Sequence, residues 1–180
     1  MMKNIIIAIC LLCCVASVSA QTNYYTTTKT FYENDYVYQC DVDAAKIVTL
    51  YNKSNNLMYI QQVYKSSGEI FIMPDNYIPL CADDNWTRTK RLSIVNNAFS
   101  SSEKQRVRGK KLSVTMYISP DTGKVIEVSF LFGNFEPYAT IPVSVYRKIE
   151  MELKNNVWYT PTTEGRKLNY IALWWAQEPR

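Results

Sequence analysis

Two stretches in the second half of the chain alternate between apolar and polar residues. Residues 112–119 and 124–132 each place an apolar side chain at every second position. A period of two is typical of a strand that buries one face. The residues between them, Pro-Asp-Thr-Gly, have turn chemistry, with a proline early and a glycine late. The pattern therefore predicts an antiparallel hairpin, whose apolar face carries Leu112, Val114, Met116 and Ile118 and then Ile126, Val128, Phe130 and Phe132.

The period changes between residues 142 and 156. An apolar stripe at helical spacing runs through this stretch, and its members are Val145, Tyr146, Ile149 and Leu153. Pro142 suits the first turn of a helix, and the pair Asn155-Asn156 suits its end. Alternation then returns in residues 168–175, which predicts a closing strand, with residues 157–167 as the return connection.

The first half also favours strands. Residues 45–51, 57–64 and 69–73 alternate, and turn-forming residues separate them, which predicts a three-strand antiparallel meander. Residues 74–89 are rich in proline, aspartate and asparagine and are expected to form a surface connection. Residues 90–99 then predict a short helix, and the spacing of Ser100 and Glu103 is that of a capping box, which starts a second one.

These elements predict an α+β fold, built mainly from antiparallel sheet. An N-terminal β-meander precedes a second half with the order strand, strand, helix, strand. We expect a β-rich half with its connection over residues 21–89 and an α+β half over residues 90–180, packed as one unit.

The first twenty residues are predicted to be a secretory signal peptide. Lys3 gives a positive start, residues 5–15 are apolar, and Val18-Ser19-Ala20 supplies the small residues that signal peptidase reads. Cleavage after Ala20 would deliver the protein to the periplasm or the outside of the cell. No later stretch is apolar over the length that a membrane-spanning helix needs.

Two cysteines follow the predicted leader. Cys40 and Cys81 are candidates for one disulfide in an oxidising compartment. The alternative is two buried thiols in separate places, and sequence spacing does not decide between them.

The composition argues against several kinds of chemistry. The chain has no histidine, which excludes Ser-His-Asp and Cys-His catalysis and removes the commonest zinc ligand. It has no phosphate-binding glycine loop. Two pairs of acidic residues remain as candidates, Asp41 with Asp43 and Asp83 with Asp84. Neither pair has the ligand spacing of a calcium loop. We therefore predict no metal and no cofactor, and the sequence leans against an enzyme.

Aromatic residues near the C-terminus are the most unusual local feature. Trp174 and Trp175 are adjacent, so in a strand they point to opposite faces of the sheet. One interpretation is an exposed binding surface, to which Tyr170 and Trp158 would also belong. The other is that both tryptophans cover core from the two sides of the sheet.

Basic residues dominate between residues 88 and 111, where Glu103 is the one acid. This segment either contacts an anionic envelope polymer or an acidic protein face, or is a solvated helix-loop region. The net charge of +4 is too small to indicate a polyanion partner, and nucleic acid is not expected for an exported chain.

Residues 111–175 resemble the C-terminal domain of TonB-type proteins. The likeness is carried by TGKVIEVSF (residues 122–130), VSVYRKIEMELKN (143–155) and VWYTPTTEGRKLNY (157–170). The whole chain is similar to a family of small secreted proteins of unknown function from Bacteroides-type gut bacteria. The TonB resemblance implies that an extended peptide adds to a sheet edge. The chain lacks the proline-rich spacer of energy-transducing TonB proteins, which argues against coupling to an inner-membrane motor.

The function predicted from the sequence is a non-catalytic periplasmic or secreted interaction protein. It would bind a peptide or envelope partner through a sheet edge and the aromatic residues Trp158, Tyr170, Trp174 and Trp175. One alternative is a hydrolase of envelope carbohydrate with two carboxylates about 5–10 Å apart. The other is a small-ligand carrier with an enclosed cavity of roughly 300 Å³ or more.

Overall fold

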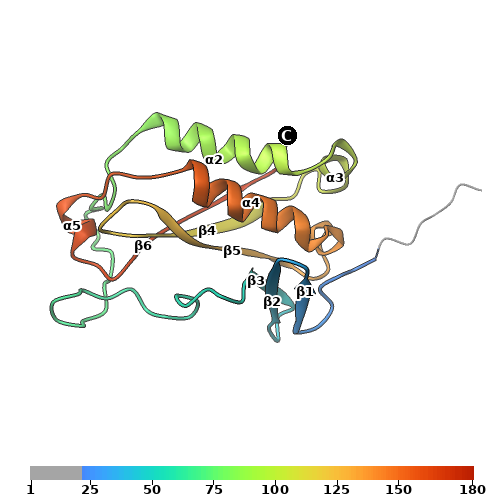
Figure 1. Ribbon diagram of the computed structural model, residues 1–180, viewed down its shortest axis with the longest axis horizontal. Coiled ribbons are helices and arrows are strands. Elements are labelled where there is room, and N and C mark those ends of the chain that lie inside the picture. The colour runs from blue at the N-terminus through green and yellow to red at the C-terminus, as the bar shows by residue number, and fades with distance from the viewer. Residues whose placement is uncertain (1–21) are drawn as a thin grey trace, which may run out of the picture.

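Six strands form a single antiparallel sheet in the computed structural model, which describes residues 22–180 (Figure 1). The predicted signal peptide therefore lies outside the described residues. The strands follow the order β1-β2-β3-β5-β4-β6 across the sheet, so β1 and β6 are its edges. They are β1 (Lys29–Glu33), β2 (Tyr36–Val42), β3 (Ile47–Asn52), β4 (Leu112–Ile118), β5 (Val125–Gly133) and β6 (Ile171–Gln177). Because β3 pairs with β5, strands from both halves of the chain belong to one sheet.

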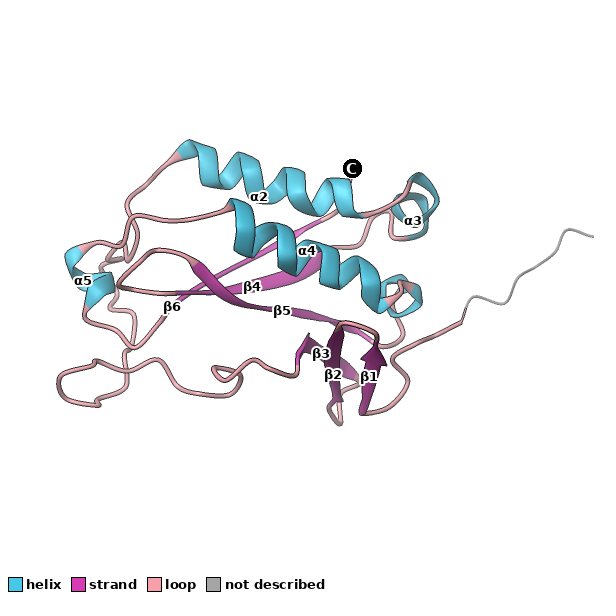
Figure 2. Ribbon diagram, viewed as in Figure 1, coloured by secondary structure: helices cyan, strands magenta, loops and turns pink. Residues whose placement is uncertain are grey.

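Two long helices cover one face of this sheet (Figure 2). They are α2 (Asn85–Ala98) and α4 (Val143–Asn156), which pack against each other, and α4 also packs on β5. The short helices are α3 (Ser101–Arg106), the 3₁₀ turn η1 (Pro137–Thr140) and α5 (Thr163–Arg166). Within residues 22–180, no helix combines the length and the apolar character that crossing a membrane requires. The α+β class predicted from the sequence is confirmed.

The second half follows the predicted order of strand, strand, helix and strand. Helix α4 buries the predicted stripe, including the fully buried Ile149 and Leu153. Pro142 is the N-cap of this helix rather than a member of its first turn. The capping box of α3 is also present, since Ser100 and Glu103 each accept the other's backbone N–H.

One position of the predicted hairpin is wrong. The alternating pattern predicts Ile126 on the apolar face of β5, yet this residue is 38% exposed. The register shifts at this point, because Tyr117 pairs with Glu127 while Ile118 pairs with Val125. Ile126 is thus the extra residue of a β-bulge, and Val125 takes the buried position.

The predicted N-terminal meander is only partly correct. Residues 47–52 form β3, but residues 57–64 and 69–73 form no strand and share one isolated bridge, between Val63 and Ile70. The sheet partners of β3 are instead β2 and β5. The predicted helix over residues 90–99 begins earlier, at Asn85, because the Asp84 side chain accepts a hydrogen bond from Thr87 N and caps it.

Residues 53–73 cross the face of the sheet opposite the long helices (Figure 1). The nearly buried carboxylate of Glu127 in β5 accepts hydrogen bonds from the backbone nitrogens of Asn56 and Leu57, at 2.7 and 3.0 Å. Further along, the hydroxyl of Tyr170 donates to the carbonyl of Ile60 at 2.6 Å. We call residues 53–73 the crossing segment. It covers part of this face and leaves the rest open.

Tyrosines fill much of the core between α4 and the sheet. Tyr146 on α4 is fully buried, stacks on Phe132 of β5 with ring centroids 5.4 Å apart, and donates its hydroxyl to Tyr138 O. Tyr25 likewise donates to Ile141 O at 2.9 Å. Burial raises the pKa of both phenols, so they stay neutral donors in the core.

Candidate functional site

The adjacent residues Trp174 and Trp175 of β6 point to opposite faces of the sheet, as predicted. Trp175 is paired in register with Val114, faces the helices and is 8% exposed. Trp174 is paired with Thr115, faces the other side and is 72% exposed. The interpretation in which both tryptophans cover core is therefore wrong for Trp174, since most of this residue is exposed to solvent.

A groove of about 620 Å³ lies along the first half of β6 and is open to solvent on one side. Its inner wall is residues 171–174 of β6, and Tyr159 contributes to the lining. The opposite wall comes from the connection before α2 and the first turns of α2, which supply Met73, Tyr77, Leu80, Asp83, Arg88 and Arg91. The groove thus lies between the edge strand β6 and the connection that leads into α2.

The outer backbone groups of β6 are unpaired within residues 22–180. β6 pairs with β4 alone, and no turn, loop or side chain of the described residues bonds the remaining groups of residues 171–177. In an antiparallel edge strand, half of the N–H and C=O groups point away from the neighbour. These groups are free to accept another strand beside the groove.

Arg91 of α2 lies where the groove meets the helix layer. Its guanidinium is 4.9 Å from the centre of the Trp175 ring, and its Nη1 donates a long hydrogen bond of 3.4 Å to Tyr159 Oη. Among residues 22–180, its Nε is the one buried side-chain polar atom without a hydrogen-bond partner. Burial raises the pKa of Tyr159, so its hydroxyl is neutral and supplies no counter-charge to Arg91.

The acidic candidates have separate structural roles. Asp83 and Asp84 both line the groove, but Asp84 is the N-cap of α2. Asp43 accepts a hydrogen bond from Ile47 N within a turn. No group of three or more metal-binding side chains occurs within residues 22–180.

Asp41 belongs to a polar cluster on the face of the sheet opposite the long helices, where the crossing segment covers it. It accepts hydrogen bonds from Tyr51, Tyr59 and Gln39. Partial burial favours the protonated acid, but these hydrogen bonds outweigh it and lower the pKa of Asp41.

Cys40 and Cys81 are both free thiols, so the disulfide candidate is not formed. Cys40 is fully buried in β2. Cys81 is half-buried in the groove wall, where its backbone forms an isolated antiparallel β-bridge with that of Pro161. The alternative of two separate thiols describes the structure. Burial raises the pKa of each to about 11, which makes both weak nucleophiles at neutral pH.

The four aromatic residues expected to share a binding surface do not come together. Only Trp174 lines the groove. Tyr170 is 5% exposed and packs on Tyr117 beneath the crossing segment, and Trp175 is covered by Arg91. Trp158 is 57% exposed but belongs to a different surface, where it contacts Trp86 at the start of α2.

Met73, Tyr77 and Arg91 are among the groove residues that the sequence pattern does not single out. Met73 and Tyr77 lie in or beside a stretch assigned to a surface connection, and both are exposed. Large apolar side chains in a turn-rich connection were the available signal. Arg91 belongs to the basic segment over residues 88–111, and nothing in the sequence distinguishes it from its basic neighbours.

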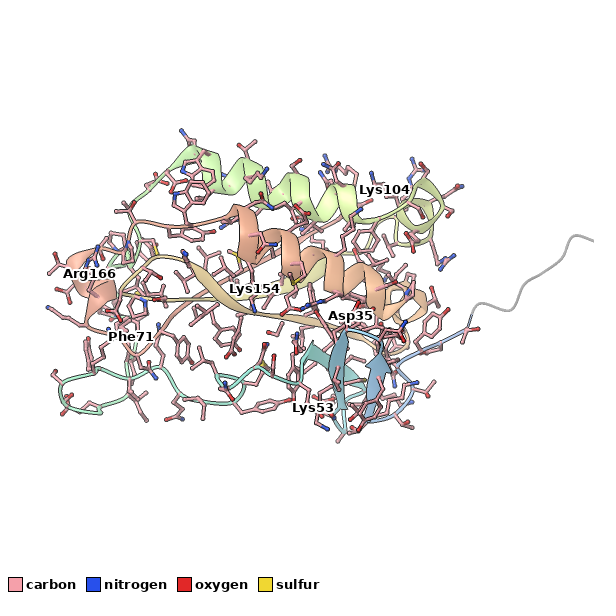
Figure 3. The ribbon with its side chains drawn as sticks, in the orientation of Figure 1. Asp35, Lys53, Phe71, Lys104, Lys154 and Arg166 are labelled. Atoms are coloured by element: carbon pink, nitrogen blue, oxygen red, sulfur yellow. The ribbon has the colours of Figure 1, made fainter. Side chains whose placement is uncertain are left out.

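The basic segment over residues 88–111 spreads along α2 and α3. Figure 3 shows Lys104 at the α3 end, far from Arg166 at the opposite end of the view. Ion pairs within residues 22–180 use Lys65, Arg147, Lys154 and Lys167 as their cations, so this segment contributes none of them.

Comparisons with known proteins agree on one family. The model of a domain of unknown function, DUF5043, matches residues 21–175. The crystal structure of a DUF5043 family protein from Bacteroides uniformis ATCC 8492 is 42% identical in sequence, with a TM-score of 0.84. The match covers 88% of this chain and 95% of that chain. A comparison with curated proteins gives no match.

These matches agree with the predicted likeness to a Bacteroides-type family of unknown function, while the likeness to the TonB C-terminal domain stays a prediction. Since the family model spans most of the sequence, the chain belongs to the DUF5043 family.

Proposed function

We propose that this protein is an interaction protein that binds an extended peptide segment of an exported or envelope protein by adding it to β6. The observation that carries the proposal is the free edge of β6 with an open groove beside it. The predicted signal peptide adds the location: the partner is met in the periplasm or outside the cell.

An added strand would find two kinds of contact here. Its backbone would pair with the outward N–H and C=O groups of β6, which supplies affinity without regard to sequence. Its side chains would then point alternately to the two faces, and the groove and Trp174 would receive them. Trp174 is suited to this role because a rigid aromatic ring offers a large apolar area at low entropic cost.

The groove gives less support to the two alternatives. Hydrolysis by a carboxylate pair needs two available acids, and Asp84 is held as the helix N-cap, which leaves Asp83 alone in the groove. A carrier needs an enclosed cavity to remove its ligand from water, and this groove is open along one side.

The proposal is tested with a displayed library of random heptapeptides, which match β6 in length (7 residues). Selected peptides should slow hydrogen exchange at amides of β6. Trp174→Ala should weaken their binding by about tenfold. The matched control is Trp158→Ala, which also removes an exposed tryptophan but lies outside the groove.

The outcomes are distinct. Equal loss in both variants, or peptides that bind without changing exchange in β6, would contradict strand addition. Protection confined to β1, the other edge, would move the site to the far side of the sheet.

A further inference from the structure

We infer that the strand added to β6 alternates acidic with apolar residues, with its acids facing α2 and its apolar side chains beside Trp174. This inference rests on the proposed function and deepens it, since it names the chemistry of the partner segment. It follows from the different character of the two faces that meet at this edge.

The period of a strand divides the partner's side chains between the two faces. The added strand, here called the guest, would pair with β6 and continue the sheet. Its successive side chains would point in turn to the face that carries the long helices (the helix face) and to the opposite face (the open face). On the helix face α2 overhangs the edge: Gln177 of β6 donates to Leu92 O, and Arg91 lies over Trp175. On the open face the neighbour is Trp174.

The helix side of the groove carries positive charge without a partner. Arg88 and Arg91 both line the groove, and neither takes part in the ion pairs of residues 22–180. Arg91 is half-buried and its Nε lacks an acceptor. A partly buried guanidinium without a counter-ion is costly, and a carboxylate placed beside it satisfies both its charge and its donors. An acid in the guest strand is the group this wall lacks.

Asp83 and Asp84, two acidic residues of the groove, determine where a carboxylate of the guest strand binds most favourably. Asp84 points its carboxylate at Thr87 N as the helix cap, while Asp83 is exposed and unengaged by hydrogen bonds among residues 22–180. Asp83 repels a carboxylate near the start of α2. The favoured position is therefore further along the helix, at Arg91.

The open side is apolar and has room for large side chains. Ala172 and Ala176 flank Trp174 at the positions two residues before and after it, so all three share one face, and all three are exposed. Small residues on both sides leave the flanks of the indole ring uncovered. Leucine-sized or aromatic side chains of the guest would pack there and bury the ring.

The test uses synthetic heptapeptides in which leucine alternates with glutamate, with glutamine or with lysine. The glutamate peptide should bind about tenfold more tightly than the glutamine peptide, and the lysine peptide should bind most weakly. Equal affinities, or a preference for lysine, would overturn the inference. A scrambled glutamate peptide of the same composition should also bind weakly, because its acids and leucines no longer segregate to two faces.

Variants assign the preference to the α2 wall. Arg88→Gln and Arg91→Met should each erase most of the advantage of glutamate over glutamine, while Lys90→Gln, an exposed neighbour outside the groove lining, should preserve it. Asp83→Asn should increase the advantage, which a folding defect cannot do. If Arg91→Met fails to fold, Arg88→Gln and Asp83→Asn decide the matter.

Failure of this inference and failure of strand addition give different results. If all the heptapeptides bind equally and still protect the amides of β6, strand addition stands and the acidic preference falls. If none protects β6, the proposed function itself is contradicted.

Discussion

The hydroxyl of Tyr38 in β2 donates a 2.5 Å hydrogen bond to Glu150 Oε2 in α4, and both side chains are fully buried. Arg147 and Lys154 on the same helix pair with this carboxylate at 2.8 and 3.6 Å. A charged group therefore joins the N-terminal strands to the main helix of the second half. Such a buried acid is tolerated because its oxygens are satisfied from several directions.

We expect Tyr38→Phe to lower the free energy of unfolding by about 1.5–3 kcal/mol, since it removes a hydrogen bond to a buried charge. Urea denaturation measures the change. Tyr32→Phe is the matched control, because Tyr32 is 76% exposed and should change stability by less than about 0.5 kcal/mol. Equal effects would mean that the buried hydroxyl makes no net contribution.

The adjacent tryptophans of β6 should respond very differently to truncation. Trp175→Ala removes a buried ring and should cost about 3–5 kcal/mol, whereas Trp174→Ala should change stability by less than about 0.5 kcal/mol. Thermal unfolding of the two variants gives the comparison. The reverse order would show that β6 pairs with β4 one residue out of the register described here.

Gly123 is expected to be irreplaceable, because it combines a positive φ of 72° with a close neighbour. A Cβ at this position would collide with the backbone carbonyl of Tyr159. Gly123→Ala should therefore cost about 1–3 kcal/mol from crowding beyond the backbone strain. Gly109→Ala isolates that strain, since Gly109 has a φ of 76° and open space around it, and should cost about 1–2 kcal/mol. Chemical denaturation of both variants tests the difference, which vanishes if the segment around Tyr159 moves aside freely.

Stability should fall at alkaline pH. Burial raises the pKa of the Cys40 thiol from 9.0 to about 11, so the unfolded chain loses this proton first. The stabilisation is complete below pH 9 and is lost as the pH rises through about 11. Cys40→Ala should show a shallower decline in unfolding free energy across that window. An unchanged slope would assign the decline to the buried tyrosines, whose raised pKa values act in the same direction.

Elements built from local patterns could be predicted from the sequence. The hairpin of β4 and β5, the helix α4 and the capping box of α3 each depend on residues that are close along the chain. Ile126 is an exception within this half, because a bulge depends on how two strands register and not on the pattern of either one.

The path of the crossing segment could not be predicted from local sequence patterns. Its residues alternate as strand residues do, but its partners are distant side chains such as Glu127 and Tyr170. Periodicity indicates which face of a strand or helix is apolar. It does not show which other residues pack against that face. The groove escaped prediction for the same reason, since Tyr77 and Trp174 meet there only after the chain has folded.

The contact between Trp86 and Trp158 joins the start of α2 to the residues that follow α4, because the two helices run in opposite directions (Figure 1). Their ring centroids are 4.6 Å apart and their planes are inclined by 53°. Two indoles at this distance and tilt couple their electronic transitions, so the pair is a natural optical reporter. The near-ultraviolet circular dichroism of this pair therefore reports whether the start of α2 stays in contact with the residues that follow α4. The measurement needs no label attached to the protein.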